Sequence, residues 1–379
     1  MNFKRSIATL CVLFCVSASP FPQDSGTRRD LAKAYLRLER ALRDHPPKGD
    51  EVRSIHKRFD NAMVQAFSRD LAGAVVSMRA LAESIDPKTG APLPERWSDE
   101  RVDATRECLL RQLDEMISQP ELADARKACR ARINLLTNRD LDFDANVFMN
   151  SPDELTRQIK TELTALQRGA EPYRNLFDID FWRPIFSKRG VVPARIFAPA
   201  PRNADRQRPL VIALHGAGGD ENLFFSGYGA GLIKELAAKN DFIVIAPNTF
   251  SLITSPDAFD AIVDTMARLY SIDTSRVYVV GHSLGAITAA GLVSRFPDRV
   301  RANVQIAGGG MVKGVRKLPP TLVILAELDP IFPLERMKQI ISEARSTGLP
   351  IDYTIARNIG HAGAVDATLE QAVEFLLAH

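Results

Sequence analysis

The fold of this chain is decided by the stretch Val277-Tyr278-Val279-Val280-Gly281-His282-Ser283-Leu284-Gly285, which runs into the small-residue segment 286–293. The β-branched and aromatic residues before Gly281 predict a strand, and the segment after Gly285 predicts a helix. Ser283 therefore stands in a sharp turn between them. Glycines two residues to either side allow a strained turn that lifts the serine Oγ clear of its neighbours. We expect Ser283 to be a nucleophile; the alternative is a serine that only occupies a turn.

Three further segments follow predicted strands, in a fixed order around this turn. The apolar run 210–214 ends in His215-Gly216-Ala217-Gly218-Gly219, a glycine-rich loop with free backbone N–H groups. The run 322–326 ends in Glu327-Leu328-Asp329-Pro330, and the alternating segment 351–355 leads into Gly360-His361-Ala362-Gly363. Because the carboxyl ends of parallel strands meet at one edge of a sheet, we expect these groups to cluster there with Ser283.

With these landmarks, residues 171–379 resemble the α/β-hydrolase superfamily, and within it the small secreted esterases grouped with polyhydroxybutyrate depolymerases, feruloyl esterases and dienelactone-hydrolase-like proteins. The resemblance implies that Ser283 attacks an acyl carbonyl, that His361 takes and returns its proton, and that Asp329 orients the imidazole. It also implies an oxyanion hole made by the backbone N–H groups of Ala217 and Leu284.

The acid and the histidine each have a plainer interpretation. Asp329 could cap the helix expected from about Leu334, and Glu327 is a rival acid on the same strand end. We favour Asp329 because Asp-x-x-Phe-Pro stands where the resemblance places Asp-x-x-hydrophobic-Pro. His361 could be a helix cap or a solvent residue, but only His379 also follows the acid.

The remaining histidines are expected to carry no proton in the reaction. His282 lies within the turn and should pack or hydrogen-bond locally, and His215 should support the glycine-rich loop. His45 and His56 have no companions at metal-ligand spacing, so no metal site is expected.

Four aromatic residues fall in loops on the same side of the predicted sheet as the proposed catalytic groups. They could line an acyl or aromatic pocket, or equally fill the core beneath those loops. They are Phe224, Phe225, Phe250 and Phe332.

The carboxy-terminal half alternates strands and helices, which predicts an α/β fold with a mostly parallel sheet covered on both faces. Expected strands lie near 191–198, 209–214, 242–246, 276–280, 303–307, 321–326 and 351–356. Expected helices lie near 228–239, 256–270, 284–296, 334–347 and 364–378. We expect residues 171–379 to form the catalytic domain.

The first residues are typical of a secretory signal. Lys4 and Arg5 precede an apolar run over 7–16 and small residues, which predicts a signal peptide over 1–18, cleaved after Ala18. That run is too short to span a membrane. The formal net charge of +3 would fall by two with the signal, so charge gives no case for nucleic acid or an anionic membrane as partner. Export to the periplasm or the medium is expected.

Residues 24–170 show apolar residues at helical spacing, which predicts a bundle of about five helices without a chemical motif. The bundle could be an interaction or substrate-positioning module, or simply a stabilising prefix. Two of its helices carry Cys108 and Cys129 on either side of Pro120. If these helices fold back antiparallel, the cysteines come within reach of a disulfide; the alternative is two buried thiols.

Together these patterns predict an exported serine hydrolase that cleaves small or polymeric carboxylic esters through an acyl-enzyme, without a cofactor. A serine peptidase or amidase on the same fold is the first alternative. A non-catalytic binding protein on a hydrolase scaffold is the second. A damaged set of Ser, His and Asp would indicate that alternative, and all three residues are present here.

Overall fold

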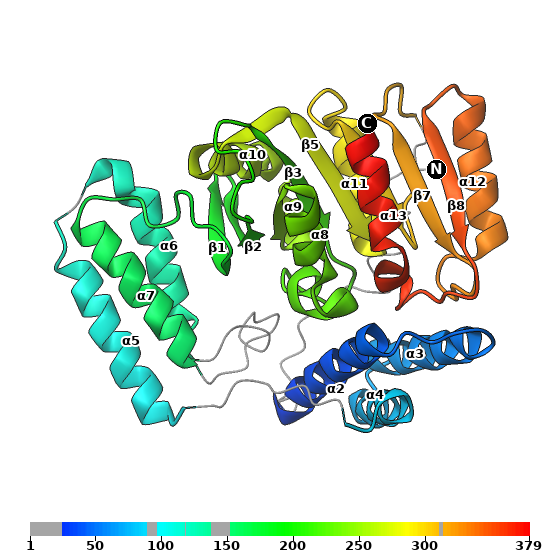
Figure 1. Cartoon of the computed structure of the whole chain (residues 1–379), viewed down its shortest axis with the longest axis horizontal. Coiled ribbons are helices and arrows are strands. Elements are labelled where there is room, and N and C mark those ends of the chain that lie inside the picture. Colours follow the sequence, from blue (N-terminus) through cyan, green and yellow to red (C-terminus); the bar gives the residue numbers. More distant parts are fainter. Residues whose placement is uncertain (1–24, 89–96, 118, 138–151, 311–313) are drawn as a thin grey trace.

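The computed structural model describes residues 25–88, 97–117, 119–137, 152–310 and 314–379 (Figure 1). The expected signal segment 1–18 lies outside these ranges. Within them, no helix combines the length and the apolar character needed to cross a bilayer.

An eight-stranded sheet forms the centre of the protein, in the order β1-β2-β4-β3-β5-β6-β7-β8. β2 pairs antiparallel with both β1 and β4, and all other neighbours are parallel. The strands are β1 (Asp180–Ser187), β2 (Gly190–Phe197), β3 (Arg208–Leu214), β4 (Ile243–Pro247), β5 (Ile272–His282), β6 (Ala302–Ile306), β7 (Thr321–Ala326) and β8 (Ile351–Ala356). This mostly parallel sheet confirms the predicted α/β-hydrolase fold.

Helices cover both faces of the sheet, because successive side chains of the central strands point to opposite sides. On β3, Val211 belongs to one apolar core and Ile212 to the other. The core that holds Val211 packs against α8 (Leu232–Asn240) and α13 (Ala364–Ala378). The core that holds Ile212 packs against α10 (Ala258–Leu269), α11 (Leu284–Arg295) and α12 (Leu334–Ser346).

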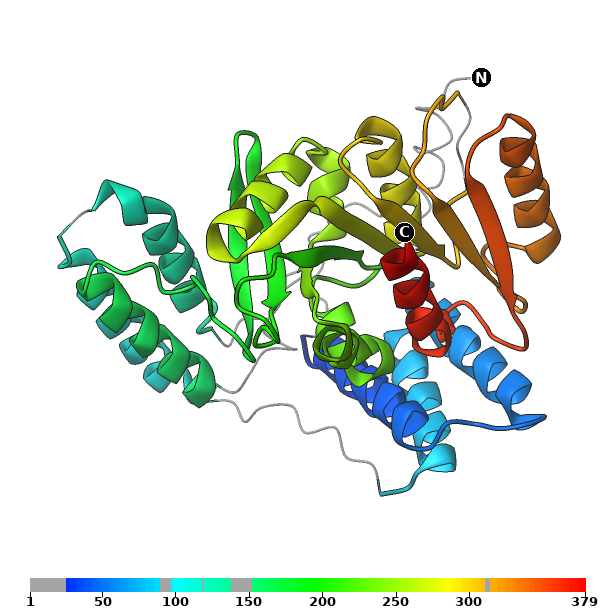
Figure 2. The same cartoon turned by 45° about the horizontal axis from the view of Figure 1, so that its top comes forward.

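Six helices precede the sheet in the described part of the chain, and they form two groups where the sequence predicts a single bundle over 24–170. They are α2 (Ser25–Asp44), α3 (Glu51–Phe67), α4 (Leu71–Ile85), α5 (Asp99–Asp114), α6 (Ala123–Asn134) and α7 (Pro152–Gln167). Helices α2–α4 form a separate apolar core around Leu38, Phe59 and Met78, which also takes in Ala362 from the loop after β8. Helices α5–α7 share the core that holds Ile212. Figures 1 and 2 show the first group along one edge of the sheet and the second beyond β1.

A buried ion pair fixes the second group to the sheet. Arg132 on α6 lies 2.8 Å from a carboxylate oxygen of Glu162 on α7, and its guanidinium donates to the main-chain oxygen of Trp182 on β1. Tyr173 donates its hydroxyl proton to the same glutamate over 2.7 Å. A buried charge is tolerated when it is paired and hydrogen-bonded in this way. The arrangement therefore specifies how α6 and α7 dock on β1.

The expected disulfide does not form, because Cys108 and Cys129 are both free thiols. Cys108 is exposed on α5, where its sulfur accepts a hydrogen bond from Gln112. Cys129 is fully buried on α6, and burial, together with Glu162, raises the pKa of its thiol. The two helices are neighbours, but one cysteine faces solvent and the other faces the core. Spacing about Pro120 does not determine how a helix is rotated about its axis.

Candidate active site

Ser283 is the single residue between β5 and α11. Its backbone has φ 53° and ψ −114°, a conformation that a residue with a side chain adopts only under strain. A Cβ at Gly281 would lie 2.2 Å from the carbonyl oxygen of Gly285, and a Cβ at Gly285 would lie 1.9 Å from that of Leu214. Only glycine fits at either position. The close approach of helix to strand therefore forces the serine into the turn expected from the sequence.

The structure brings Ser283, His361 and Asp329 together. Nε2 of His361 lies 3.0 Å from Oγ of Ser283, and Nδ1 of the same ring lies 2.8 Å from Oδ2 of Asp329. His361 and Asp329 are buried, whereas Ser283 is half-buried. A hydroxyl, an imidazole and a carboxylate in this order can transfer the hydroxyl proton to the ring and stabilise the resulting imidazolium.

The carboxylate of Asp329 is held in place by its own loop. Its Oδ1 accepts from the backbone N–H groups of Ile331 and Phe332, at 2.8 and 2.9 Å, which leaves Oδ2 for the imidazole. The rival acid Glu327 instead accepts from Arg357 and from the backbone N–H of Asn358. Of the two acids, only Asp329 contacts His361 in the structure.

The glycine-rich loop after β3 passes beside the serine. A Cβ at Gly216 would lie 3.4 Å from Cβ of Ser283, and Ala217 is the next residue of this loop. Leu284 is the first residue of α11, so its N–H has no acceptor within the helix, and the positive end of the helix dipole lies at the serine. An oxyanion hole made by the N–H groups of Ala217 and Leu284 remains a prediction.

His282 connects this loop to His361. Nε2 of His282 lies 3.1 Å from the main-chain oxygen of His361, and Nδ1 lies 2.9 Å from the hydroxyl of Tyr228. Because a carbonyl oxygen only accepts, Nε2 carries the proton and Nδ1 accepts from the tyrosine. The hydroxyl in turn accepts from the N–H of Gly216 over 3.2 Å. Burial lowers the pKa of His282 to about 3, so the ring is neutral at neutral pH.

His215 supports the glycine-rich loop from its other side. Its Nε2 accepts from the N–H of Thr249 over 2.9 Å, and its main-chain oxygen accepts from the threonine hydroxyl. Thr249 begins the short helix α9 (Thr249–Thr254), which the sequence patterns do not indicate. Burial lowers the pKa of His215 to about 4, and the ring is therefore an uncharged support.

The four aromatic candidates separate into two pairs. Phe332 is half-buried and stacks on the His361 imidazole, with ring centres 5.8 Å apart, and Phe250 lies 6.1 Å from the ring of His215. Phe224 and Phe225 are fully buried in the core beneath the loop. A pocket role for Phe332 and Phe250 stays a prediction. Phe224 and Phe225 instead fill the core beneath the loops, which was the second interpretation of these residues.

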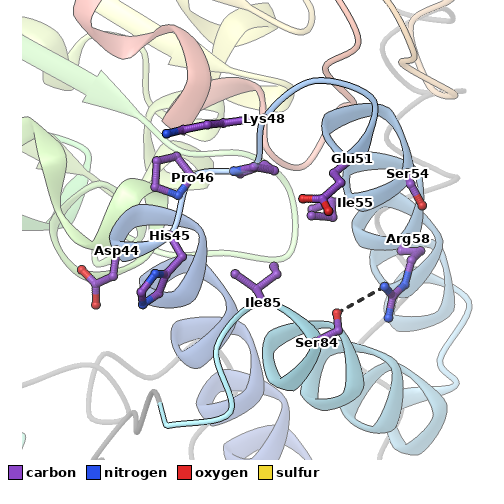
Figure 3. Close-up of a pocket in the computed structure, with 11 residues that line it drawn as sticks. Asp44, His45, Pro46, Lys48, Glu51, Ser54, Ile55, Arg58, Ser84 and Ile85 are labelled. Carbon is purple, nitrogen blue, oxygen red and sulfur yellow. Dashed lines mark hydrogen bonds between the residues drawn. The ribbon is translucent and has the colours of Figure 1, made fainter.

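The described residues arrange no metal-binding group, and a cavity among the amino-terminal helices lies away from the serine. No group of three or more His, Cys, Asp or Glu side chains in the described ranges is arranged to hold a metal ion. A cavity of about 590 Å³ lies between the ends of α2, α3 and α4, with Lys48, Glu51 and Arg58 among its lining residues (Figure 3). Ser283 and His361 are not among them.

Comparisons with known proteins agree with the fold and with the class of site. No protein-family model matches the sequence. Feruloyl esterase B of Thermothelomyces thermophilus is 29% identical over 130 residues, which cover 30% of this chain and 44% of the esterase. Poly(3-hydroxyalkanoate) depolymerase C of Paucimonas lemoignei is 29% identical over 133 residues, covering 30% of this chain and 31% of the depolymerase. The chain thus spans less than half the length of these curated relatives.

Among solved structures, a thermostable esterase is 25% identical with a TM-score of 0.45, over 54% of this chain and 64% of that one. The predicted resemblance is confirmed: the chain has the α/β-hydrolase fold, and the two sequence relatives named above are an esterase and a depolymerase.

Proposed function

We propose that this protein is a serine hydrolase that cleaves carboxylic esters through an acyl-enzyme. The observation that carries the proposal is the pair of contacts made by His361, 3.0 Å to Ser283 Oγ and 2.8 Å to Asp329 Oδ2. They form the nucleophile, base and orienting acid that acyl transfer requires. The names of the sequence relatives, a feruloyl esterase and a depolymerase, support an ester as the bond cleaved.

In the proposed first half-reaction, Oγ of Ser283 attacks the acyl carbonyl while its proton passes to Nε2 of His361. The carboxylate of Asp329 stabilises the imidazolium that forms. The N–H groups of Ala217 and Leu284 bind the negative oxygen of the tetrahedral intermediate. His361 then gives the proton to the departing alkoxide, and the alcohol leaves.

In the second half-reaction, water takes the place of the alcohol. His361 accepts a proton from water as its oxygen attacks the acyl-serine, and the proton returns to Oγ of Ser283 when the bond breaks. The net change is ester plus water to acid plus alcohol. Every proton is carried by residues of this chain, so the proposed reaction uses no cofactor.

The relatives' names point to feruloyl esters and to poly(3-hydroxyalkanoate), and the proposal covers small or polymeric esters. We also propose export, which the basic, apolar and small-residue pattern of residues 1–18 supports. An amidase or peptidase would use the same three groups, but amides demand more protonation of the leaving group, and none of the relatives named above is an amidase.

A fluorophosphonate probe tests the proposal directly. The intact protein is expected to gain one covalent adduct, mapped to Ser283 by peptide mass spectrometry, and Ser283→Ala is expected to gain none. Ser275 is a suitable control, because it lies in β5, the strand that leads to Ser283, and its hydroxyl bonds to Asp273; Ser275→Ala should label like the wild type. Absence of an adduct at Ser283, or equal ester turnover by wild type and Ser283→Ala, would contradict the proposal.

A further inference from the structure

The loop that carries His361 is bound by a helix from the far end of the chain. Asp60 on α3 accepts hydrogen bonds from the backbone N–H groups of His361 and Ala362, at 2.9 and 2.8 Å. All three residues are buried. Buried backbone N–H groups need acceptors, and Asp60 supplies both here.

Helix and loop are in direct contact at two glycines. A Cβ at Gly360 would lie 2.3 Å from Oδ2 of Asp60, and a Cβ at Gly363 would lie 2.4 Å from Cε1 of His56. His56 and Asp60 are four residues apart and therefore share one face of α3. The two glycines allow the loop to approach that face more closely than any residue with a side chain would.

His361 is consequently held at each of its polar groups. Asp60 accepts from its N–H, and Nε2 of His282 donates to its main-chain oxygen. Asp329 and Ser283 contact the two ring nitrogens. The sheet and its loops supply three of these four partners, and α3 supplies the fourth. Removal of Asp60 would leave the backbone on one side of the imidazole without its anchor.

The same helix also reaches the glycine-rich loop. A Cβ at Gly218 would lie 3.1 Å from Cε1 of Phe67, the last residue of α3. Seven residues separate Asp60 from Phe67, which is two turns, or about 10 Å along one face of the helix. The carboxy-terminal half of α3 therefore lies across the carboxyl edge of the sheet, from the loop of His361 to the loop of Ala217. Figures 1 and 2 show α3 beside the start of α13, next to this edge.

We propose that Asp60 is a positioning residue for His361, and that α3 thereby belongs to the active site. The inference rests on the proposed function and assigns a role to α2–α4: they fix the loop of the general base. Misplacement of a catalytic group by about 1 Å can lower a rate roughly 100-fold. Loss of Asp60 should therefore act on turnover more than on substrate binding.

The variant Asp60→Ala tests the positioning role, and Asp70→Ala is its matched control. Asp70 also accepts a backbone N–H, that of Gly73, where it caps the first turn of α4 in the same group of helices. Both variants should lower the melting temperature. Only Asp60→Ala should lower kcat, by roughly 10- to 100-fold, with KM little changed. Asp60→Asn keeps one acceptor and should give an intermediate kcat, which also provides a variant that folds if the alanine does not.

A second readout needs no turnover. The proton between Nδ1 of His361 and Asp329 should give a strongly downfield proton NMR signal, which His361→Gln removes. That signal should persist in Asp70→Ala and shift or disappear in Asp60→Ala or Asp60→Asn. If the wild type takes up no fluorophosphonate and cleaves no ester, the proposed function fails and the NMR signal alone decides the positioning role. Folded Asp60 variants with wild-type kcat and an unchanged signal would overturn the inference.

Discussion

The hydroxyl of Tyr228 lies 2.9 Å from Nδ1 of His282 and also accepts a hydrogen bond from the backbone N–H of Gly216. One phenol therefore joins the glycine-rich loop to the turn that carries Ser283. His282 in turn bonds to the backbone of His361. The three loops of the site are linked through buried groups that touch no reacting atom.

Tyr228→Phe should lower both stability and turnover. The change leaves Nδ1 of His282 and the N–H of Gly216 buried without partners, at about 1–3 kcal/mol each. Thermal unfolding and ester turnover measure the two effects. Tyr270→Phe is the matched control, because that hydroxyl bonds to the main-chain oxygen of Leu176, far from the serine in the fold. A Tyr228→Phe enzyme with unchanged kcat would contradict the linkage.

Asp329→Asn should lower kcat by about 10³- to 10⁴-fold with little loss of structure, because an amide cannot stabilise the imidazolium or hold the same tautomer. Glu327→Gln changes an acid two residues away that bonds only to Arg357 and Asn358, and it should stay near wild type. Steady-state kinetics on one short acyl ester compares the two. An equal loss of kcat in both variants would contradict the role of Asp329 as the acid that orients His361.

Stability should depend on pH through Glu39. Burial and the nearby Asp366 raise the pKa of Glu39 from 4.5 to about 8. In the unfolded chain this carboxyl ionises near pH 4.5, so folding becomes less favourable as pH rises from there through about 8, by up to several kcal/mol. Glu39→Gln removes that loss. Its stability relative to wild type should therefore increase between pH 5 and pH 8, as measured by urea unfolding.

Glu83→Gln serves as the control for that series. Glu83 is an exposed carboxylate on α4, paired with Arg37. The difference in unfolding free energy between Glu83→Gln and the wild type should stay nearly constant over the same pH range. A constant difference for Glu39→Gln as well would show that the buried carboxylate is not linked to folding.

Two glycines in α11 should respond in opposite ways to alanine. At Gly285 a Cβ would lie 1.9 Å from the Leu214 carbonyl oxygen, so Gly285→Ala should push the helix away from the strand. The variant should lose about 1–3 kcal/mol or more of unfolding free energy, and its activity as well. Gly291 is exposed and a Cβ there meets nothing within 4 Å. Gly291→Ala should stabilise the helix by up to about 1 kcal/mol. Unfolding curves for both variants check the contrast.

Much of the sheet and the serine turn could be predicted, because they depend on signals that are local in the sequence. The expected strands 321–326 and 351–356 coincide with β7 and β8. The alternating residues of β8 are typical of a strand with one solvated face, and the continuous apolar run of β7 is typical of a buried parallel strand. β1 does not carry this pattern: it contains Pro184 and the buried Arg183, whose charge is matched by Glu171.

The contacts missed from the sequence join segments that no local pattern relates. Asp60 and His361 are 301 residues apart, and an aspartate on a helix is most often a solvated surface residue. The same limit applies to Tyr228 and His282. The predicted disulfide between Cys108 and Cys129 is wrong for a related reason. How α5 is rotated about its own axis depends on packing, which the spacing of the cysteines does not reveal.

The hydrogen bond between Asp60 and His361 also bears on the order in which the site is assembled during synthesis. During synthesis at roughly 5–20 residues per second, the ribosome adds the histidine about 15–60 s after the aspartate. Helices α2–α4 are therefore synthesised well before the loop that Asp60 anchors, and Ala362 completes their apolar core only when that loop docks. On the proposed function, the nascent polypeptide lacks a positioned general base until the loop of His361 docks on α3.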